Sequence, residues 1–332
     1  MTTFRPTAVV ATIAALLLTG GAGAELVLLK TGVRTEGVIR RADGEGVEQQ
    51  LRNGKTLTHP WSAIYAVREE APAEERAVAA TVRDPLAAAT AYGKLAARAE
   101  RPWNEVRLRL LAVQCLLRTG RTTDALDEFL AVTTKYPENV RFAETPEFAA
   151  ADAEKLLPTL ASCEAGTAPP IVRAVATAIR ADLLLACGKI DEAEAAVKLL
   201  LRATDAQGVG LARVRTARIA LSRGNAPRAL ELLESAERDL GTAFQPDLLW
   251  RKAQVLIAAG QTEKGLLAAA VVPARYPWCA DRAARCLRLI AETRSQEYRA
   301  REAAAAWKWL VQDYPWSPVA IGIPAAYAEP ER

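Results

Sequence analysis

Few side chains in this sequence could carry catalysis or bind a metal. A single histidine, His59, is present among 332 residues, so imidazole bases and histidine-rich metal sites have almost no place in this protein. Because His59 stands directly before Pro60, we expect it to be a loop or turn residue rather than a catalyst.

The five cysteines form no Cys-x-x-Cys pair, which argues against metal binding and thioredoxin-like chemistry. Cys115 and Cys187 fall in helical stretches where small buried residues are normal. Cys279 and Cys286 would be separated by a helical rise of ~10 Å, which is too long for a disulfide. We expect buried free thiols; the alternative is one disulfide in which Cys163 takes part.

Two glycine-containing segments and the acidic pairs have ordinary structural explanations. Gly44–Gly46 and Gly208–Gly210 are too short and too poorly placed to hold a phosphate. The pair Asp191-Glu192 falls where a helix begins, and carboxylates there interact favourably with the helix dipole. Since the sequence has no Gly-x-Ser-x-Gly and no His-Glu-x-x-His motif, it predicts a protein that is not an enzyme, with no catalytic residue, no metal site and no cofactor.

The first residues predict that the protein is exported from the cytoplasm. An apolar run covers Ala8–Leu18, and the small residues Ala22 and Ala24 suit a signal peptidase. We expect a signal peptide over residues 1–24, cleavage after Ala24, and export to the periplasm or the cell exterior. The alternative, an uncleaved membrane anchor, needs a longer apolar run to cross ~30 Å of hydrocarbon. No later segment is apolar for long enough to span a membrane.

Composition places the rest of the chain among ordinary globular proteins. Hydrophobic residues make up 51% and charged residues 25% of the sequence, and the net charge is only +4. These values exclude a disordered chain and a disulfide-dense miniprotein. So small a charge argues against a nucleic-acid partner, and one or two domains are expected at this length.

From residue 25 to residue 68, hydrophobic residues alternate with a period of two between turn residues, which predicts short β-strands. The expected strands are Leu26–Lys30, Val33–Arg40, Val47–Leu51, Lys55–Thr58 and Ile64–Val67. The Asn53-Gly54 pair is typical of a hairpin turn. The segment resembles the small SH3-like or Sm-like β-barrels, and the resemblance implies binding of a peptide or a nucleic acid, or packing on a neighbour. Because it has no aromatic stripe beyond Trp61 and Tyr65, we expect packing.

After a linker over residues 69–83, the period changes to 3.6 and the sequence becomes rich in Ala, Leu and Arg. Glycines recur at the expected turns between helices, at Gly120, Gly188, Gly224 and Gly260. Small residues recur at fixed offsets from these turns and mark where paired helices cross closely. They are Ala125, Ala193, Ala229 and Gly265 after the turns, and Val113, Ala181, Ala217 and Ala253 before them. A last unit is expected to turn near Tyr298, with Ala291 and Ala303 at the same offsets.

This grid, together with the Tyr-Pro pairs that end helices at Pro137, Pro277 and Pro315, resembles the tetratricopeptide repeats over residues 84–320. The resemblance implies a mainly α fold: a right-handed α-solenoid of helical hairpins, preceded by the small all-β barrel and followed by a tail at 321–332. The alternative is a helical bundle without repeats.

The sequence departs from the family pattern in three places. No unit has the family's Trp near the start of its first helix, and Asp205 and Gly241 stand where closing prolines would be. Val140–Pro170 is degenerate, and Pro158, Gly166 and the Pro169-Pro170 pair in it predict an irregular helix and a long loop there. A helix over Pro85–Ala99 is expected to supply half of an opening repeat or a cap.

In tetratricopeptide arrays the first helices line a concave groove. The groove-facing offsets of the family select Arg107, Gln114, Arg118, Asp182, Arg218, Trp250, Gln254, Arg285 and Arg288 in this sequence. Because arginine forks bind carboxylates bidentately, such a groove would suit an acidic or C-terminal peptide segment. The alternative is that these are solvated residues on arginine-rich helices.

Large aromatic residues gather near the end of the array. They are Tyr276, Trp278, Trp307, Trp309, Tyr314 and Trp316. Aromatic side chains anchor many interfaces, so these residues predict either a partner surface or a cap on the last repeat.

Three functions remain open from the sequence. The first is an exported non-catalytic scaffold that binds a protein or peptide partner in the cell envelope, an acidic one if the groove arginines take part. The alternative is an enzyme or accessory subunit that acts on cell-wall polymer, with a groove carboxylate such as Asp182 in the reaction. The third, a nucleic-acid binder through the barrel, is disfavoured by the signal peptide. The oligomeric state stays open.

Overall fold

A computed structural model describes residues 25–42, 46–60, 62–68, 75, 77–79, 82–99, 102–137, 145–201, 206–239, 244–277, 279–324 and 327. The predicted signal peptide lies outside these residues, as do Trp61 and Trp278. An antiparallel sheet comes first and helices follow, so the expected mainly α fold with a preceding β domain is confirmed. Among the described helices, none is long and apolar enough to cross a membrane.

The sheet has five strands, each at one of the predicted positions. They are β1 Glu25–Leu29, β2 Arg34–Ala42, β3 Gly46–Leu51, β4 Thr56–Pro60 and β5 Ile64–Arg68. Their order is β4-β3-β2-β1-β5, and every neighbouring pair is antiparallel. The register shifts between Ile39 and Arg41 of β2, a bulge that lets this strand bend between its two neighbours.

The expectation that His59 is a loop or turn residue is wrong. His59 lies within β4, opposite Val47 of β3, and its side chain is buried. Its Nε2 lies 3.4 Å from Thr35 Oγ1, and burial lowers its pKa. The strand extends through Pro60 because β4 is at the edge of the sheet, where a missing backbone N–H is tolerated.

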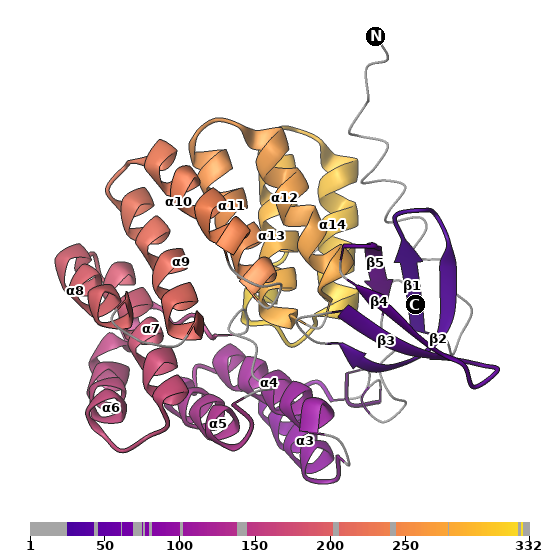
Figure 1. The fold of residues 1–332 in the computed structure, drawn as a ribbon, viewed down its shortest axis with the longest axis horizontal. Coiled ribbons are helices and arrows are strands. Elements are labelled where there is room, and N and C mark those ends of the chain that lie inside the picture. Colours follow the sequence, from indigo (N-terminus) through magenta and orange to yellow (C-terminus); the bar gives the residue numbers. More distant parts are fainter. Residues whose placement is uncertain are drawn as a thin grey trace.

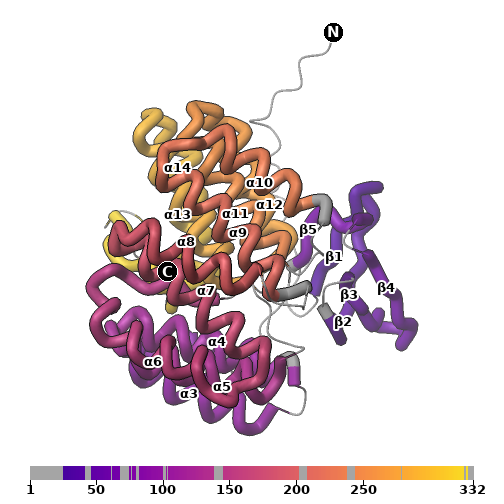
Figure 2. Tube along the Cα trace, turned by 60° about the vertical axis from the view of Figure 1, so that its left-hand side comes forward, coloured from indigo at the N-terminus to yellow at the C-terminus, as the bar shows by residue number. Residues whose placement is uncertain are grey.

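Side chains from the helical region complete the interior of the sheet. Val27, Ile39 and Ile64 form a buried cluster with Tyr276 and Cys279, which follow the end of a helix. Figure 2 shows the sheet beside the helical array, with β5 nearest to helix α12, Thr262–Arg275. The β domain therefore packs on its neighbour, as its small number of aromatic residues predicts.

The helices follow one another along a curved path (Figure 1). They are α3 Pro85–Ala97, α4 Pro102–Arg118, α5 Thr122–Lys135, α6 Ala153–Ala165, α7 Pro170–Ala186, α8 Ile190–Leu201, α9 Ala206–Ser222, α10 Ala226–Asp239, α11 Gln245–Ala258, α12 Thr262–Arg275, α13 Ala280–Gln296 and α14 Ala300–Asp313, with short 3-10 helices η2 Ala150–Asp152 and η4 Pro318–Ala320. From α4 to α14, helices joined by a tight turn pack as pairs. The first helices α7, α9, α11 and α13 also contact one another in series, so they line the inner side of the curve.

Each predicted turn contains one residue in the left-handed backbone conformation. Gly120, Gly188, Gly224 and Gly260 have φ between 73° and 78°, and Tyr298 takes the equivalent place with φ of 59°. Around Gly120, the N–H of Arg121 donates to the carbonyl of Leu116 at 3.0 Å and that of Gly120 to Leu117 at 3.1 Å. This pattern satisfies the last carbonyls of the first helix and sets the direction of the second.

The small-residue grid lies at the helix crossings. Ala181, Ala217 and Ala253 in the first helices expose at most 1% of their surface, as do Ala193 and Ala229 in the second. At Gly265, an added Cβ would lie 2.9 Å from the Ala253 carbonyl oxygen. The paired helices therefore approach as closely as the spacing predicts.

In the degenerate unit, the expected irregular helix is the continuous helix α6, and the loop that follows it is short. Pro158 lies inside α6 without ending it, and only residues 166–169 separate α6 from α7. Residues 145–149, directly before η2 and α6, have no regular secondary structure. The predicted linker is also partly helical, at Glu75 and residues 77–79.

The C-terminal end of the array returns to its first helices. Trp316 is buried in a cluster with Tyr92 of α3 and with Leu108 and Cys115 of α4. Arg118 Nη1 donates to the Pro315 carbonyl, and η4 contacts α4. The two ends of the arc in Figure 1 are thus joined by side-chain contacts.

Candidate functional site

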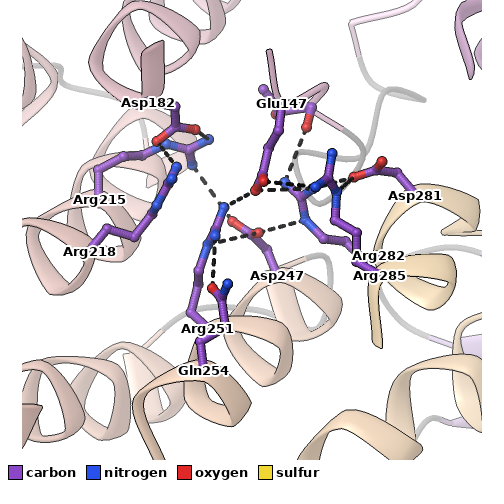
Figure 3. Close-up of polar contacts among 11 residues, drawn as sticks. Glu147, Asp182, Arg215, Arg218, Asp247, Arg251, Gln254, Asp281, Arg282 and Arg285 are labelled. Carbon is purple, nitrogen blue, oxygen red and sulfur yellow. Dashed lines mark hydrogen bonds and ion pairs between the residues drawn. The ribbon is translucent and has the colours of Figure 1, made fainter. Parts of the chain in front are cut away.

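Charged side chains from four first helices meet on the inner side of the array (Figure 3). We call this group the arginine cluster. It consists of Asp182 from α7, Arg215 and Arg218 from α9, Asp247 and Arg251 from α11, Asp281, Arg282 and Arg285 from α13, and Glu147 from the non-helical segment 145–149. Eight of these nine residues come from first helices, which contact one another in series.

Asp182 joins α7 to α9. Its Oδ2 accepts a hydrogen bond of 2.9 Å from Arg215 Nη2, and its Oδ1 is paired with Arg218 Nη1. Asp182 and Arg215 are both buried, while Arg218 keeps 20% of its side chain exposed. One carboxylate is thus shared by two guanidinium groups, of which only that of Arg218 is partly exposed.

Asp247 joins α11 to α13, and Asp281 pairs with two arginines of its own helix, α13. Arg282 Nε donates to Asp247 Oδ1 at 2.8 Å, and its Nη1 donates to Asp281 Oδ2. Arg285 Nε also donates to Asp281 Oδ2, at 2.8 Å. Burial opposes ionisation of Asp247, but Arg282 and Arg251 outweigh it and lower the pKa of that carboxyl. Asp247 is therefore ionised at neutral pH.

Glu147 is the one carboxylate of the cluster that does not come from a helix. Arg251 Nη2 donates to its Oε1, Arg282 Nη1 lies 3.4 Å from that same oxygen, and Arg285 Nη1 lies 3.3 Å from Oε2. Burial opposes its ionisation, yet Arg251, Arg285 and Arg282 hold its pKa well below the usual value. Arg282 Nη2 also donates to the carbonyl of Thr145 at 3.1 Å.

The arginines of the cluster outnumber its carboxylates by one. Burial, together with repulsion from Arg218, lowers the pKa of Arg251 to about 10, so Arg251 remains protonated at neutral pH. Its Nε has only a distant partner, Asp247 Oδ1 at 3.7 Å. The excess of positive charge makes the inner face a place where a carboxylate is strongly favoured.

The structure brings four of the nine predicted groove residues together. Asp182, Arg218 and Arg285 belong to the arginine cluster, and Gln254 accepts a 3.0 Å hydrogen bond from Arg251 Nη1.

The other five groove residues lie elsewhere and contact other parts of the same chain. Trp250 packs in the buried interior of α11 to α14, and Gln114 is buried on α4. Arg107 donates to Glu75 at 2.7 and 2.5 Å. Arg118 and Arg288 donate to carbonyl groups of the C-terminal segment, at Pro315 and at Val319 and Ile321. The predicted residues therefore do not line one open groove.

Sequence reasoning missed part of the cluster. Arg215 and Arg251 recur one turn before Arg218 and Gln254, on the same helix face, and this repetition could have found them. Glu147 had no such signal, because it lies in a segment that follows no period.

The aromatic residues near the end of the chain do not form one surface. Tyr276 packs on the sheet, Trp307 and Tyr314 lie in the buried interior of α11 to α14, and Trp316 packs on α3 and α4. Trp309 is partly buried, and its Nε1 donates to Asp313 Oδ2 at 2.8 Å. Most of them are interior residues of three different clusters.

The described residues offer little for redox or metal chemistry. All five cysteines are free thiols, of which Cys115, Cys279 and Cys286 are buried. Burial raises the pKa of Cys115 to about 12, which keeps it in the unreactive thiol form. Within the described ranges, no three His, Cys, Asp or Glu side chains are placed to hold a metal ion.

Comparison of the chain with models of protein families, with curated proteins and with solved structures gives no match.

Proposed function

We propose that this protein is an exported, non-catalytic scaffold of the tetratricopeptide type that holds a protein or peptide partner in the cell envelope. The repeat type is supported by the left-handed turn residues and by the buried small residues at the helix crossings. An SH3-like β domain is supported by the strand order and by the bulge in β2. In this proposal the β domain stabilises the array rather than binding a ligand.

The observation that carries the proposal is the way in which Glu147 is held. Three arginines from two helix pairs converge on one carboxylate of a segment that is neither helix nor strand. Extended acidic segments are recognised by this chemistry, since guanidinium groups fix the carboxylate and the peptide backbone lies along the surface. A partner segment that carries a carboxylate would find the same groups on this face.

The proposed location follows from the signal peptide. Cleavage after Ala24 would leave Glu25 as the first residue, and Glu25 already belongs to the sheet: its carbonyl accepts a 2.9 Å hydrogen bond from Gln49 Nε2. Its side chain accepts the backbone N–H of Ile39. The mature chain would therefore begin at a residue that the fold uses.

The alternative of an enzyme on cell-wall polymer gains nothing from this geometry. Asp182, the carboxylate that such an enzyme would use, is buried and engaged by Arg215 and Arg218. A carboxylate that is 5% exposed and has both oxygens engaged by guanidinium groups is poorly placed to take a proton from a substrate.

Affinity capture tests the proposal. The mature chain is immobilised, exposed to an envelope extract, and compared with Arg218→Ala and Arg285→Ala. A matched control is Arg228→Ala, which removes an arginine with 57% exposure from α10. We expect one partner, identified by mass spectrometry, to be retained by the wild type and the control and lost at least tenfold in the two cluster variants. Equal retention by all four proteins, or no retention above background, would contradict the proposal.

A further inference from the structure

We propose that residues 145–149 are a built-in ligand of the arginine cluster, and that an acidic partner segment binds by taking their place. The inference rests on the proposed function and names the class of partner: an extended segment in which a carboxylate is followed by an aromatic ring.

The segment is held by the contacts of a bound peptide. Its Glu147 carboxylate meets Arg251, Arg282 and Arg285, and its Thr145 carbonyl accepts from Arg282. Its third contact is the Phe148 ring, which is buried against the large apolar interior of the first helix pairs. Side-chain charge, backbone carbonyl and aromatic anchor together are what a receptor needs to recognise a short extended chain.

The bound part of the segment has a clear end. The backbone N–H of Ala149 donates to Asp152 Oδ2 at 3.1 Å, and Thr122 Oγ1 donates to Asp152 Oδ1 at 3.1 Å. These bonds fix the start of η2 to helix α5. Residues after Ala149 therefore stay attached to the helices, while Thr145 and Glu147 contact the cluster through a carbonyl and a carboxylate.

The cluster requires a carboxylate at the Glu147 position but does not require that it belong to this chain. Without Glu147, Arg251 and Arg285 would each lose a partner, and the excess of positive charge in the cluster would rise. An unpaired charge in such a position is strongly unfavourable. A carboxylate supplied by another chain would restore the balance, so the two ligands exclude each other.

Competition by an attached ligand lowers the apparent affinity for a free one. A tethered segment acts at a high effective concentration. A free acidic segment can bind only to those molecules in which residues 145–149 have left the arginine cluster. Removal of the Glu147 charge should therefore tighten the binding of an external acidic segment by about tenfold or more.

The test uses the full mature chain and a blocked peptide, Thr-Pro-Glu-Phe-Ala, whose only charge is the glutamate. Its dissociation constant is measured by calorimetry with the wild type and with Glu147→Gln, which keeps the side-chain shape. The control peptide has Gln in place of Glu. We expect binding to Glu147→Gln at least tenfold tighter than to the wild type, and no binding of the control peptide.

A second variant covers the case in which Glu147→Gln does not fold. Phe148→Ala removes the aromatic anchor and leaves the charges in place, and it should also bind the peptide more tightly than the wild type. The inference is overturned if the folded variants bind no peptide, if they bind it no better than the wild type does, or if the control peptide binds equally well.

The capture experiment separates this failure from a failure of the proposed function. If no partner is retained by the wild type or by Glu147→Gln, the proposed function fails. If a partner is retained equally by both, the scaffold proposal stands and the built-in ligand does not.

Discussion

At the scale of single residues, Tyr298 differs from the other turn residues because it is not a glycine. It occupies the left-handed position that glycine holds in the other four turns, with φ of 59° and 95% of its surface exposed. A side chain in this conformation costs roughly 1–2 kcal/mol, and the exposed ring recovers little of that by packing.

Replacement of this residue by glycine is expected to stabilise the protein. Tyr298→Gly should raise the free energy of unfolding by about 0.5 kcal/mol, because relief of the backbone strain exceeds the added freedom of the unfolded chain. The opposite kind of change is Gly260→Ala at an equivalent turn, where an added Cβ meets no atom within 4 Å. It should lower the free energy of unfolding by about 1 kcal/mol through backbone strain alone. Urea unfolding measures both, and a loss of stability in Tyr298→Gly would show that the exposed ring stabilises the turn after all.

Glu105 gives a prediction that depends on pH. Burial alone would raise the pKa of this carboxyl, but hydrogen bonds from Lys135, Tyr136 and Arg109 lower it to about 2. A group whose pKa is lower in the folded state than in the unfolded chain contributes stability above its unfolded pKa. That contribution is lost as the pH falls toward the folded value.

Glu105→Gln should therefore cost about 2 kcal/mol near pH 7, as expected for loss of hydrogen bonds to a charged group. The difference from the wild type should shrink between pH 4.5 and about 2. Asp124→Asn, at an exposed carboxylate of the same helix pair, should cost less than about 0.5 kcal/mol. A difference for Glu105→Gln that stays constant down to pH 2 would show that the charge of Glu105 is not the source of this stability.

At the scale of elements, the sequence predicts what is determined locally. The helix turns follow from glycine and Tyr298, whose backbone conformation ends one helix within a single turn. The strands follow from the alternation of hydrophobic and polar residues. The place of His59 cannot be predicted in this way, because its neighbour Pro60 indicates a turn, whereas the edge position of β4, which tolerates a proline, depends on strand order.

The arginine cluster could be predicted only in part, for the same reason. Asp182, Arg218 and Arg285 lie on repeated helix faces, so the repeat places them on the inner side. Glu147 lies in a segment without a period, and its contacts with α11 and α13 depend on the path of the whole chain. A pattern of spacings carries no information about such a contact.

The joint between the sheet and the helices yields the next prediction. Tyr276, at the end of α12, is buried against Val27, Ile64 and other residues of the sheet. Tyr276→Ala should lower the free energy of unfolding by about 3–4 kcal/mol through the cavity that it leaves, and amide exchange in β1 and β5 should become faster. Tyr276→Phe keeps the ring and should cost no more than about 1.5 kcal/mol. Unchanged exchange in the sheet of Tyr276→Ala would mean that the β domain holds its fold without the helices.

At the scale of the whole molecule, the joined ends change how the array responds to perturbation. In an open repeat protein each unit contacts only its neighbours, so a change at one end leaves the other end unaffected. In this chain Trp316, which follows α14, packs against Tyr92 of α3 and Cys115 of α4. Arg118 and Arg288 bind carbonyls of the same C-terminal segment from opposite ends of the array.

Loss of the Trp316 ring should therefore weaken the packing of α3 and α4, the first two helices of the array. Trp316→Ala is expected to reduce the free energy of unfolding by about 3 kcal/mol and to speed amide exchange in α3 and α4, because their shared cluster loses its largest C-terminal member. Trp309→Ala removes an equal ring that is partly exposed on α14, and its effect on exchange should remain within α13 and α14. If Trp316→Ala likewise leaves α3 and α4 unaffected, the ends behave as independent units.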